Sequence, residues 1–252
     1  MEIFSVSKFA VGLKPHIQLN NASKRVSFGQ GLTKDTFEST SVLKLFDEAA
    51  IRKMISQNPE ISKILTANKI PVQLNMSELQ ELAQNHCKDT QNVAAGIANN
   101  LPQALKQQVN MRDLKDGALL HDFGKVLIPP EILNKNGSLT LAEHKIMDLH
   151  SILGYELLKN SGVNEKVLNL VKNHHNNVNS DFIPDINLQI LNLADKYSAL
   201  TENRVYKQAY TPQKALTTIY SDVKHGKVHP FLFNALVKSV NSAPVPVKEG
   251  IV

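Results

Sequence analysis

Apolar side chains recur at helical spacing from about residue 40 to about residue 240, and this periodicity constrains the fold more than any other feature. Within residues 41–56, Val42, Leu45 and Ala49 lie three and four positions apart, which is the spacing of one buried helix face. Several later stretches follow the same pattern. No stretch shows the sustained alternation of apolar and polar residues that predicts a β-strand. We therefore predict an all-α fold.

Capping signals mark several helix ends. Asn58 followed by Pro59 predicts a helix start, because asparagine caps the first backbone N–H groups and proline fits the first helical position. Thr140 and Glu143 form a T-x-x-E capping box ahead of another helix. Gly162 suits the position just after a helix C-terminus.

The composition divides the chain into four parts. Residues 1–38 are rich in Ser, Asn, Lys, Gly and Gln without sustained periodicity, and we expect a flexible arm there. Residues 39–74 are a small helical segment, either an input domain or a cap packed on the rest. Residues 75–242 are the main helical domain, beginning with one helix over 75–100. Residues 243–252 are a C-terminal tail.

Length and composition are those of an ordinary globular protein. The chain has 252 residues, of which 42% are hydrophobic, and such a chain can bury a large core without disulfide bonds. The single cysteine, Cys87, excludes an intramolecular disulfide and a zinc site of paired cysteines. No apolar run approaches the ~20 residues that span a bilayer, and the N-terminal residues lack a signal-peptide pattern. We expect a cytoplasmic protein without membrane contact.

The charge pattern favours a small anionic ligand over a nucleic-acid polymer. The net charge is +5 and the isoelectric point is near 9.1. DNA- and RNA-binding proteins usually cluster their basic residues and place aromatic side chains among them. Here the basic residues are scattered, aromatics make up 6% of the chain and tryptophan is absent. We therefore expect no DNA or RNA partner.

Histidine is the most informative residue type in this chain. Among nine histidines, two sequence pairs stand out, His121-Asp122 and His174-His175. Burying adjacent imidazoles without a shared role costs desolvation free energy, and imidazole with carboxylate suits Mn, Fe or Zn. For His121 a second interpretation stays open, namely a helix C-terminus at which a histidine complements the helix dipole.

The motifs around these pairs occur in a definite order. The first stretch reads His121-Asp-Phe-Gly-Lys125 and continues through Ile-Pro-Pro-Glu-Ile-Leu-Asn-Lys, Leu-Thr, Glu143 and His150 to Gly154. The second stretch reads Ala-Asp195-Lys-Tyr-Ser-Ala-Leu-Thr201-Glu-Asn-Arg204-Val-Tyr206. Over roughly residues 75–240, the chain resembles HD-domain metal-dependent phosphohydrolases of the HD-GYP type. The resemblance implies an HD-domain helical bundle.

The resemblance also implies a binuclear metal centre. One divalent ion would take His86, His121 and Asp195, the other would take His150, His174 and His175, and Asp122 would bridge the two. Iron or manganese is the first expectation, with zinc, nickel, magnesium or calcium as alternatives. Some family members hold a third metal with a glutamate at the position of Leu82, so we expect no third ion here.

The activity implied by the resemblance is that of a metal-dependent phosphodiesterase in bacterial signalling. A water activated by two metals would attack phosphorus in a cyclic dinucleotide or related nucleotide, with Asp122 and Lys125 as catalytic residues. Lys125, Arg204 and Lys207 would bind the substrate phosphates through charge and hydrogen bonds. For Arg204 and Lys207, a solvated helix end is the alternative interpretation.

The chain departs from the family after the histidine doublet. Family members read H-H-E-x-x-D-G-x-G-Y-P, whereas this chain has Asn176 in place of the glutamate, lacks the Gly-Tyr pair and has a shorter loop before Pro184. Ser198 also replaces an aspartate that is common in the second stretch. Two alternatives therefore stay open: a catalytically silent nucleotide-sensing module that signals to a partner through the N-terminal segment, and an HD-type phosphohydrolase of mononucleotides.

The remaining candidates are predicted to lie outside the site. His144 precedes His150 by six residues, so it should face solvent on the same helix. His225 and His229 sit beside a glycine and a proline and suit loops. Cys87 should pack in the core.

Overall fold

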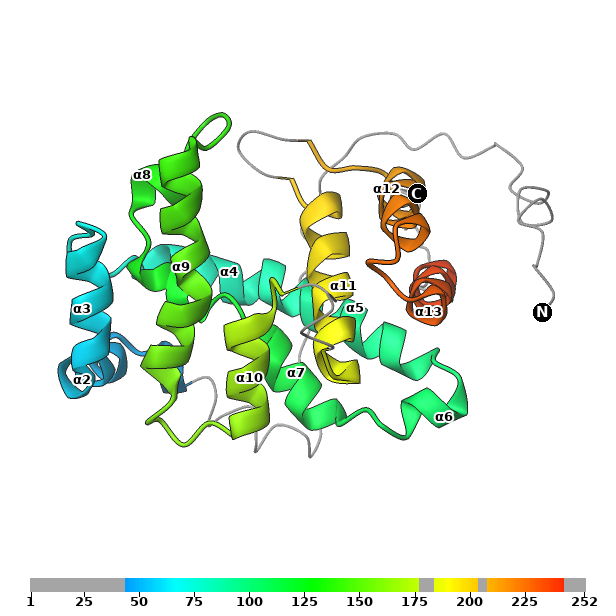
Figure 1. Cartoon of the computed structure of the whole chain (residues 1–252), viewed down its shortest axis with the longest axis horizontal. Helices are drawn as coiled ribbons and strands as arrows, with labels where there is room; N and C mark the ends of the chain where they lie inside the picture. Colours follow the sequence, from blue (N-terminus) through cyan, green and yellow to red (C-terminus); the bar gives the residue numbers. More distant parts are fainter. Residues whose placement is uncertain (1–43, 177–183, 204–207, 243–252) are drawn as a thin grey trace, which may run out of the picture. The chain divides into compact units, whose positions relative to one another are not determined.

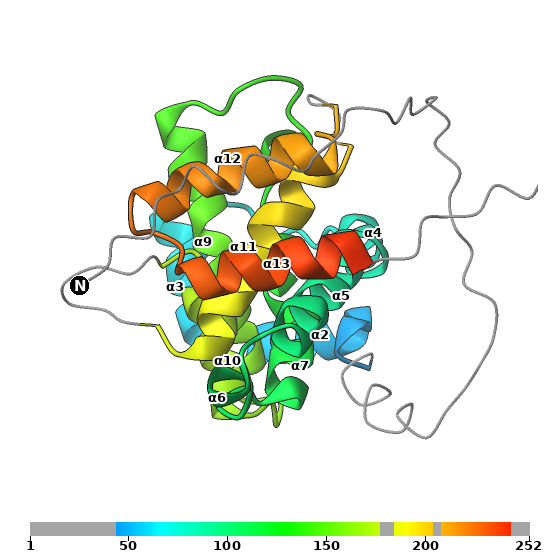
Figure 2. The same cartoon turned by 90° about the vertical axis from the view of Figure 1, so that its right-hand side faces the viewer.

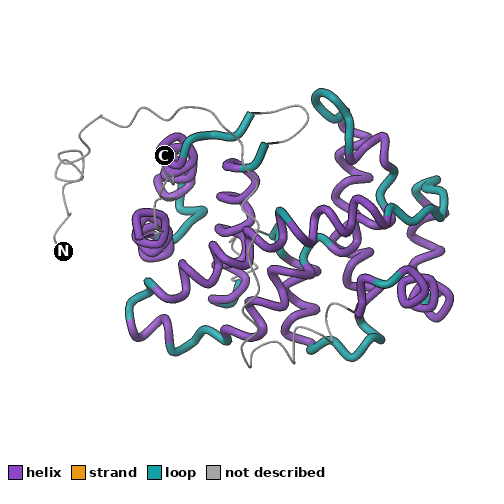
Figure 3. Tube along the Cα trace, turned by 180° about the vertical axis from the view of Figure 1, so that it is seen from behind, coloured by secondary structure: helices purple, strands orange, loops and turns teal. Residues whose placement is uncertain are grey.

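The structure, a computed structural model, describes residues 44–176, 184–203 and 208–242 (Figure 1). Every regular element in these ranges is an α-helix or a 3-10 helix (Figure 3), so the predicted all-α fold is confirmed. None of the described helices is both long and apolar enough to cross a bilayer. The predicted arm at 1–38 and the tail at 243–252 lie outside the described residues.

The described helices follow one another along the chain in a simple order. In order they are η2 (Lys44–Phe46), α2 (Glu48–Gln57), α3 (Pro59–Ala67), α4 (Met76–Gln84), α5 (His86–Asn99), α6 (Gln103–Lys106), α7 (Met111–Leu120), η3 (Phe123–Leu127), α8 (Pro130–Leu133), α9 (Leu141–Leu158), α10 (Glu165–Asn173), α11 (Ile186–Thr201), α12 (Pro212–Lys224) and α13 (Pro230–Ser242). The prediction of one helix over residues 75–100 is wrong. Asn85 leaves helical geometry, with φ −108° and ψ −87°, and this break makes His86 the first residue of α5.

One apolar core lies around α5. This helix packs against α7, α11 and α13, and α13 crosses the bundle on the face shown in Figure 2. Fully buried members of this core include Ile97, Leu114, Leu191 and Leu236. Because burial of each such side chain contributes about 1.5–3 kcal/mol, this cluster holds α5, α7 and α11 in fixed relative positions.

A second apolar core joins the N-terminal helices to α9 and η3. Helices α2 and α3 both contact α9. Ile51, Ile61 and Leu65 are buried in the same cluster as Phe123 and Leu153. The first described helices, α2 and α3, therefore share an apolar core with the main domain.

The predicted capping signals are present. Asn58 is the N-cap of α3 and Pro59 occupies the first helical position. Thr140 and Glu143 make both hydrogen bonds of the capping box at the start of α9. Gly162 has φ +81°, a left-handed conformation that glycine adopts without a steric penalty. These helix ends are therefore set locally, as the sequence predicts.

We predict that Asn58→Ala lowers the free energy of unfolding by about 2–3 kcal/mol. Besides capping α3, the Asn58 amide donates to the main-chain oxygen of Glu156 at 2.8 Å and to its Oε2 at 2.7 Å. Both acceptors belong to α9, and Asn58 is buried. Urea unfolding measures the change. Asn68→Ala is the matched control, because the exposed Asn68 amide bonds only within the end of α3. Equal losses in the two variants would contradict the prediction.

Candidate metal centre

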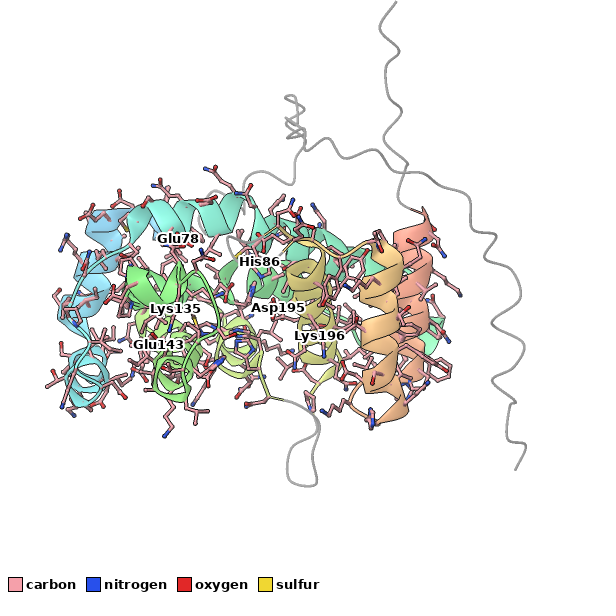
Figure 4. All side chains as sticks on the ribbon, turned by 90° about the horizontal axis from the view of Figure 1, so that it is seen from above. Glu78, His86, Lys135, Glu143, Asp195 and Lys196 are labelled. Atoms are coloured by element: carbon pink, nitrogen blue, oxygen red, sulfur yellow. The ribbon has the colours of Figure 1, made fainter. Side chains whose placement is uncertain are left out.

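Seven imidazole and carboxylate side chains converge from five helices. They are His86 at the start of α5, His121 and Asp122 at the end of α7, His150 in α9, His174 and His175 at the end of α10, and Asp195 in α11. All are buried except Asp195, whose side chain is 18% exposed, and the more exposed His175. Figure 4 shows His86 and Asp195 close together. The structure thus brings all seven predicted ligands to one place.

Backbone carbonyls fix the protonation of three of the rings. Each Nδ1 atom lies within hydrogen-bond distance of the carbonyl three residues earlier: His121 to Ala118 at 2.8 Å, His150 to Met147 at 2.6 Å and His174 to Val171 at 2.8 Å. A carbonyl oxygen only accepts hydrogen bonds, so each Nδ1 donates. In the neutral ring, Nε2 then carries the lone pair and is free to bind a metal.

Three Nε2 atoms meet in the first half of the site, which we call the His150 group (His150, His174 and His175). Nε2 of His150 lies 3.1 Å from Nε2 of His174 and 3.0 Å from Nε2 of His175. Because His150 and His174 both hold their protons on Nδ1, their Nε2 lone pairs face each other. A cation bound between them would remove this repulsion.

The second half, the His86 group, consists of His86, His121 and Asp195. Nε2 of His86 lies 3.0 Å from Oδ1 of Asp195. Nε2 of His121 lies 3.8 Å from the same oxygen, and it is buried with no hydrogen-bond partner among the described residues. Two imidazole nitrogens and one carboxylate oxygen therefore share a small volume.

Asp122 lies between the two groups. Its Oδ2 is 3.6 Å from Nε2 of His86 and 3.4 Å from Nε2 of His121. Its Oδ1 is 3.4 Å from Nε2 of His150 and 4.0 Å from Nε2 of His174. One carboxylate thus presents one oxygen to each group, as a carboxylate shared by two metal ions does.

The electrostatics keep most of these groups in the states that a metal requires. Burial alone would raise the pKa of Asp122, but Lys125 and the neighbouring histidines outweigh it and hold the pKa well below its usual range. Burial lowers the pKa of His150 to about 4 and that of His174 well below its usual value. Ionised carboxylates and neutral imidazoles are the forms that bind divalent metals.

His86 behaves differently from these rings. Burial would lower its pKa, but the hydrogen bond to Asp195, the close contact with the Glu202 carboxylate and the charge of Asp122 raise the pKa to about 9. In the metal-free chain a proton therefore occupies Nε2 beside Asp195. A metal ion would take the place of that proton. The facing lone pairs of the His150 group and this proton site show that the residues present fit divalent metal ions.

Gly124, two residues after Asp122, permits a close contact between the backbone of η3 and the backbone of α9. A Cβ atom at this position would overlap the carbonyl oxygen of His150 and lie 2.5 Å from the amide nitrogen of Gly154. The start of η3 therefore packs backbone to backbone on α9. This contact fixes Asp122 relative to His150, and only glycine permits it.

The other sequence predictions have mixed outcomes. Lys125 is at the site, where its Nζ donates to Oδ2 of Asp122 at 2.7 Å. Arg204 and Lys207 lie outside the described residues. His144 is exposed and Cys87 is buried, as predicted.

Two further histidines, His225 and His229, are also exposed and lie away from the ligand set at the ends of α12 and α13. Leu82, at the position where some relatives of this type place a third-metal glutamate, is a half-buried residue of α4.

Sequence reasoning missed Glu202. Its Oε2 lies 3.3 Å from Nδ1 of His86, and its side chain is 28% exposed. Glu202 follows Asp195 by seven residues, so the two lie on the same face of α11. That spacing is the one sequence signal that could have pointed to it.

The fold and the site define a class of proteins, helical domains with a buried histidine–aspartate centre suited to divalent metals. The particular family is the HD domain, whose model matches residues 83–200. This range contains all seven candidate ligands. This match confirms the predicted resemblance to HD-domain proteins.

Curated bacterial proteins are similar to parts of this chain. The cyclic di-GMP phosphodiesterase response regulator RpfG of Xanthomonas campestris pv. campestris is 33% identical over 123 residues, 44% of this chain and 32% of that protein. The cyclic di-GMP phosphodiesterase PA4108 of Pseudomonas aeruginosa is 29% identical over 58% of this chain and 36% of its own length. The 3'3'-cGAMP-specific phosphodiesterase 3 of Vibrio cholerae is 30% identical over 52% and 30%, respectively. The chain thus spans about a third of the length of these relatives.

The solved structures that align with this chain include an HD domain. The HD domain of the phosphodiesterase PgpH from L. monocytogenes aligns with a TM-score of 0.47 at 16% identity. The alignment covers 65% of this chain and 96% of that one.

We predict that Gly124→Ala destabilises the protein by at least about 3 kcal/mol, because backbone atoms cannot move aside as side chains do. Gly154→Ala is the graded comparison. Its Cβ would lie 3.0 Å from Cγ1 of Val171 and 3.1 Å from the amide nitrogen of Gly124, so a smaller loss is expected. Denaturant unfolding of both variants measures which one loses more unfolding free energy. A Gly124→Ala variant as stable as Gly154→Ala would contradict the close backbone contact.

We predict that the metal-free protein is most stable near pH 6.5. The pKa of His86 rises from 6.5 to about 9 on folding, so its contribution is complete below pH 6.5 and is lost as the pH rises through 9. The pKa values of His150 and His174 fall on folding, so stability also decreases as the pH drops below 6.5. Thermal unfolding in the presence of a chelator, repeated from acidic to alkaline pH, measures the loss of stability on each side of pH 6.5. His86→Gln should reduce the loss of stability above pH 6.5. An unchanged loss in this variant would refute the attribution of that loss to His86.

Proposed function

We propose that this chain is a metal-dependent phosphodiesterase that hydrolyses a cyclic dinucleotide. The observation that carries the proposal is the position of Asp122, whose two oxygens face two separate groups of Nε2 atoms. A carboxylate between two such groups suits a pair of divalent ions, and paired ions suit phosphoester hydrolysis. The curated relatives, named as cyclic di-GMP and 3'3'-cGAMP phosphodiesterases, support the same reaction.

We further propose that two ions share the centre. The His86 group would hold one ion, the His150 group the other, and Asp122 would contribute an oxygen to each. Iron or manganese is the first choice, and zinc, nickel, magnesium or calcium are alternatives, because histidine-rich sites accept several divalent metals. When bound, such ions lower the pKa of a water molecule and neutralise charge on phosphate oxygens.

The side chains of the protein orient and neutralise the reacting groups. Lys125 offsets the charge of Asp122 through their contact at 2.7 Å, and its side chain is 15% exposed. We propose that Lys125 also contacts a phosphate oxygen of the substrate, as the resemblance implies. Arg204 and Lys207 are proposed to bind further phosphate oxygens, as the resemblance implies. Arginine suits forked phosphate binding, whereas lysine acts as a point charge.

A guanine-containing cyclic dinucleotide is the proposed first substrate, in bacterial signalling. The bacterial relatives support this choice through the substrates in their names. The Gly-Tyr pair expected after the histidine doublet is absent from the sequence. Base selection must therefore rest on other residues, and the substrate has to be identified with a panel of nucleotides.

We predict that protein prepared with iron or manganese under anaerobic conditions carries about two ions per chain and converts cyclic di-GMP or 3'3'-cGAMP to linear products. Asp122→Asn should reduce the rate by more than the roughly 100-fold typical of losing an outer-shell partner, because both ions lose a ligand. Elemental analysis and chromatography of the products measure the two quantities. The panel also includes cyclic di-AMP and mononucleotides.

His144→Ala is the control for this experiment. His144 lies on α9 with His150 but is exposed, so metal content and rate should stay at the level of the unmodified protein. Unchanged hydrolysis by Asp122→Asn would refute the mechanism. Nucleotide binding without product would instead support the silent sensing module.

A further inference from the structure

His86 is not held by the kind of backbone contact that fixes the other buried ligand rings. His121, His150 and His174 donate Nδ1–H to the carbonyl three residues earlier. That geometry needs helical residues ahead of the histidine, whereas His86 opens α5 directly after the break at Asn85. Within the described ranges, Nδ1 of His86 is buried and makes no hydrogen bond with any backbone or side-chain group. The ring therefore needs a side-chain acceptor, because an unpaired buried donor is costly.

Glu202 offers that acceptor. Its Oε2 lies 3.3 Å from Nδ1 of His86, close enough for an ion pair but without the geometry of a hydrogen bond, so a small rotation of the Glu202 side chain would complete the pairing. Glu202 is the C-cap residue of α11, and its backbone N–H donates to the carbonyl of Ser198. Since α5 and α11 pack closely, the backbone itself places this carboxylate beside the ring.

The opposite edge of the ring faces the metal centre. Nε2 of His86 lies 3.0 Å from Oδ1 of Asp195 and 3.6 Å from Oδ2 of Asp122. When Nε2 binds an ion, the remaining ring proton is on Nδ1, and that proton points toward Glu202. A carboxylate that accepts this proton fixes the orientation of the ring and makes Nε2 a stronger ligand.

We propose that Glu202 is a positioning residue for His86 and strengthens the binding of the ion held by the His86 group. The inference rests on the proposed two-metal function and extends it to a residue outside the seven ligands. Ser198, one turn earlier on α11, does not take this role. Its Oγ is buried and has no hydrogen-bond partner in the part of the chain that the structure describes.

The test compares Glu202→Met with Glu202→Gln. Both variants are loaded with cobalt(II), and competition with a chelator gives a dissociation constant for each ion. Methionine removes the acceptor, so one ion should bind roughly 10–100-fold more weakly while the other changes by less than about twofold. Glutamine retains an acceptor oxygen and should restore most of the affinity. The cobalt absorption spectrum should change at the weakened position alone, whereas a general loss of folding would weaken both ions alike.

Asp89→Asn is the matched control. Asp89 is an exposed residue in the first turn of α5. Burial and the charge of Glu202 raise its pKa, and the charge of His86 opposes this rise. If positioning is the cause, neutralising Asp89 should leave both affinities unchanged. Equal weakening in Asp89→Asn, or unchanged affinities in Glu202→Met, would overturn the role of Glu202. If the unmodified protein binds no cobalt, the proposed two-metal function fails and the inference falls with it, so the two failures are distinguishable.

Discussion

The structure depends on one electrostatic constraint, the convergence of imidazole rings on the buried carboxylate of Asp122 between two apolar cores. Polar groups in such a place are costly unless each is paired. Asp122 is the common partner, because its oxygens face both the His86 group and the His150 group. Binding of metal ions would complete the pairing, so we expect metal binding and stability to be coupled.

The helix ends explain how these side chains reach one point. His121 and His174 are the C-cap residues of α7 and α10, and each uses the carbonyl three residues earlier to orient its ring. A histidine at a helix C-terminus therefore gains a fixed tautomer without any partner from elsewhere. The helix-dipole interpretation of His121 and the metal interpretation are compatible, since one geometry serves both.

The parts of the fold and site that the sequence predicts are those encoded by neighbouring residues. The His121-Asp122 pair, the capping box at Thr140 and the helical periodicity are local, and each has its expected structure. The break at Asn85 and the approach of Glu202 to His86 depend on how α5 packs on α11. Contacts between distant residues leave little trace in a single sequence, so the break could not be predicted, and the seven-residue spacing from Asp195 was the one available signal for Glu202.

The N-terminal helices bear on how such a centre could be regulated. The backbone N–H of Asn75 donates to the carbonyl of Val126 at 2.9 Å, and its side-chain amide donates to the carbonyl of Ile128. Asn58 is bonded to Glu156 on α9. The residues ahead of α4 and α5 thus hold both η3, which follows Asp122, and α9, which carries His150. Any movement of these helices would therefore shift Asp122 relative to His150, because both are anchored to the same N-terminal segment.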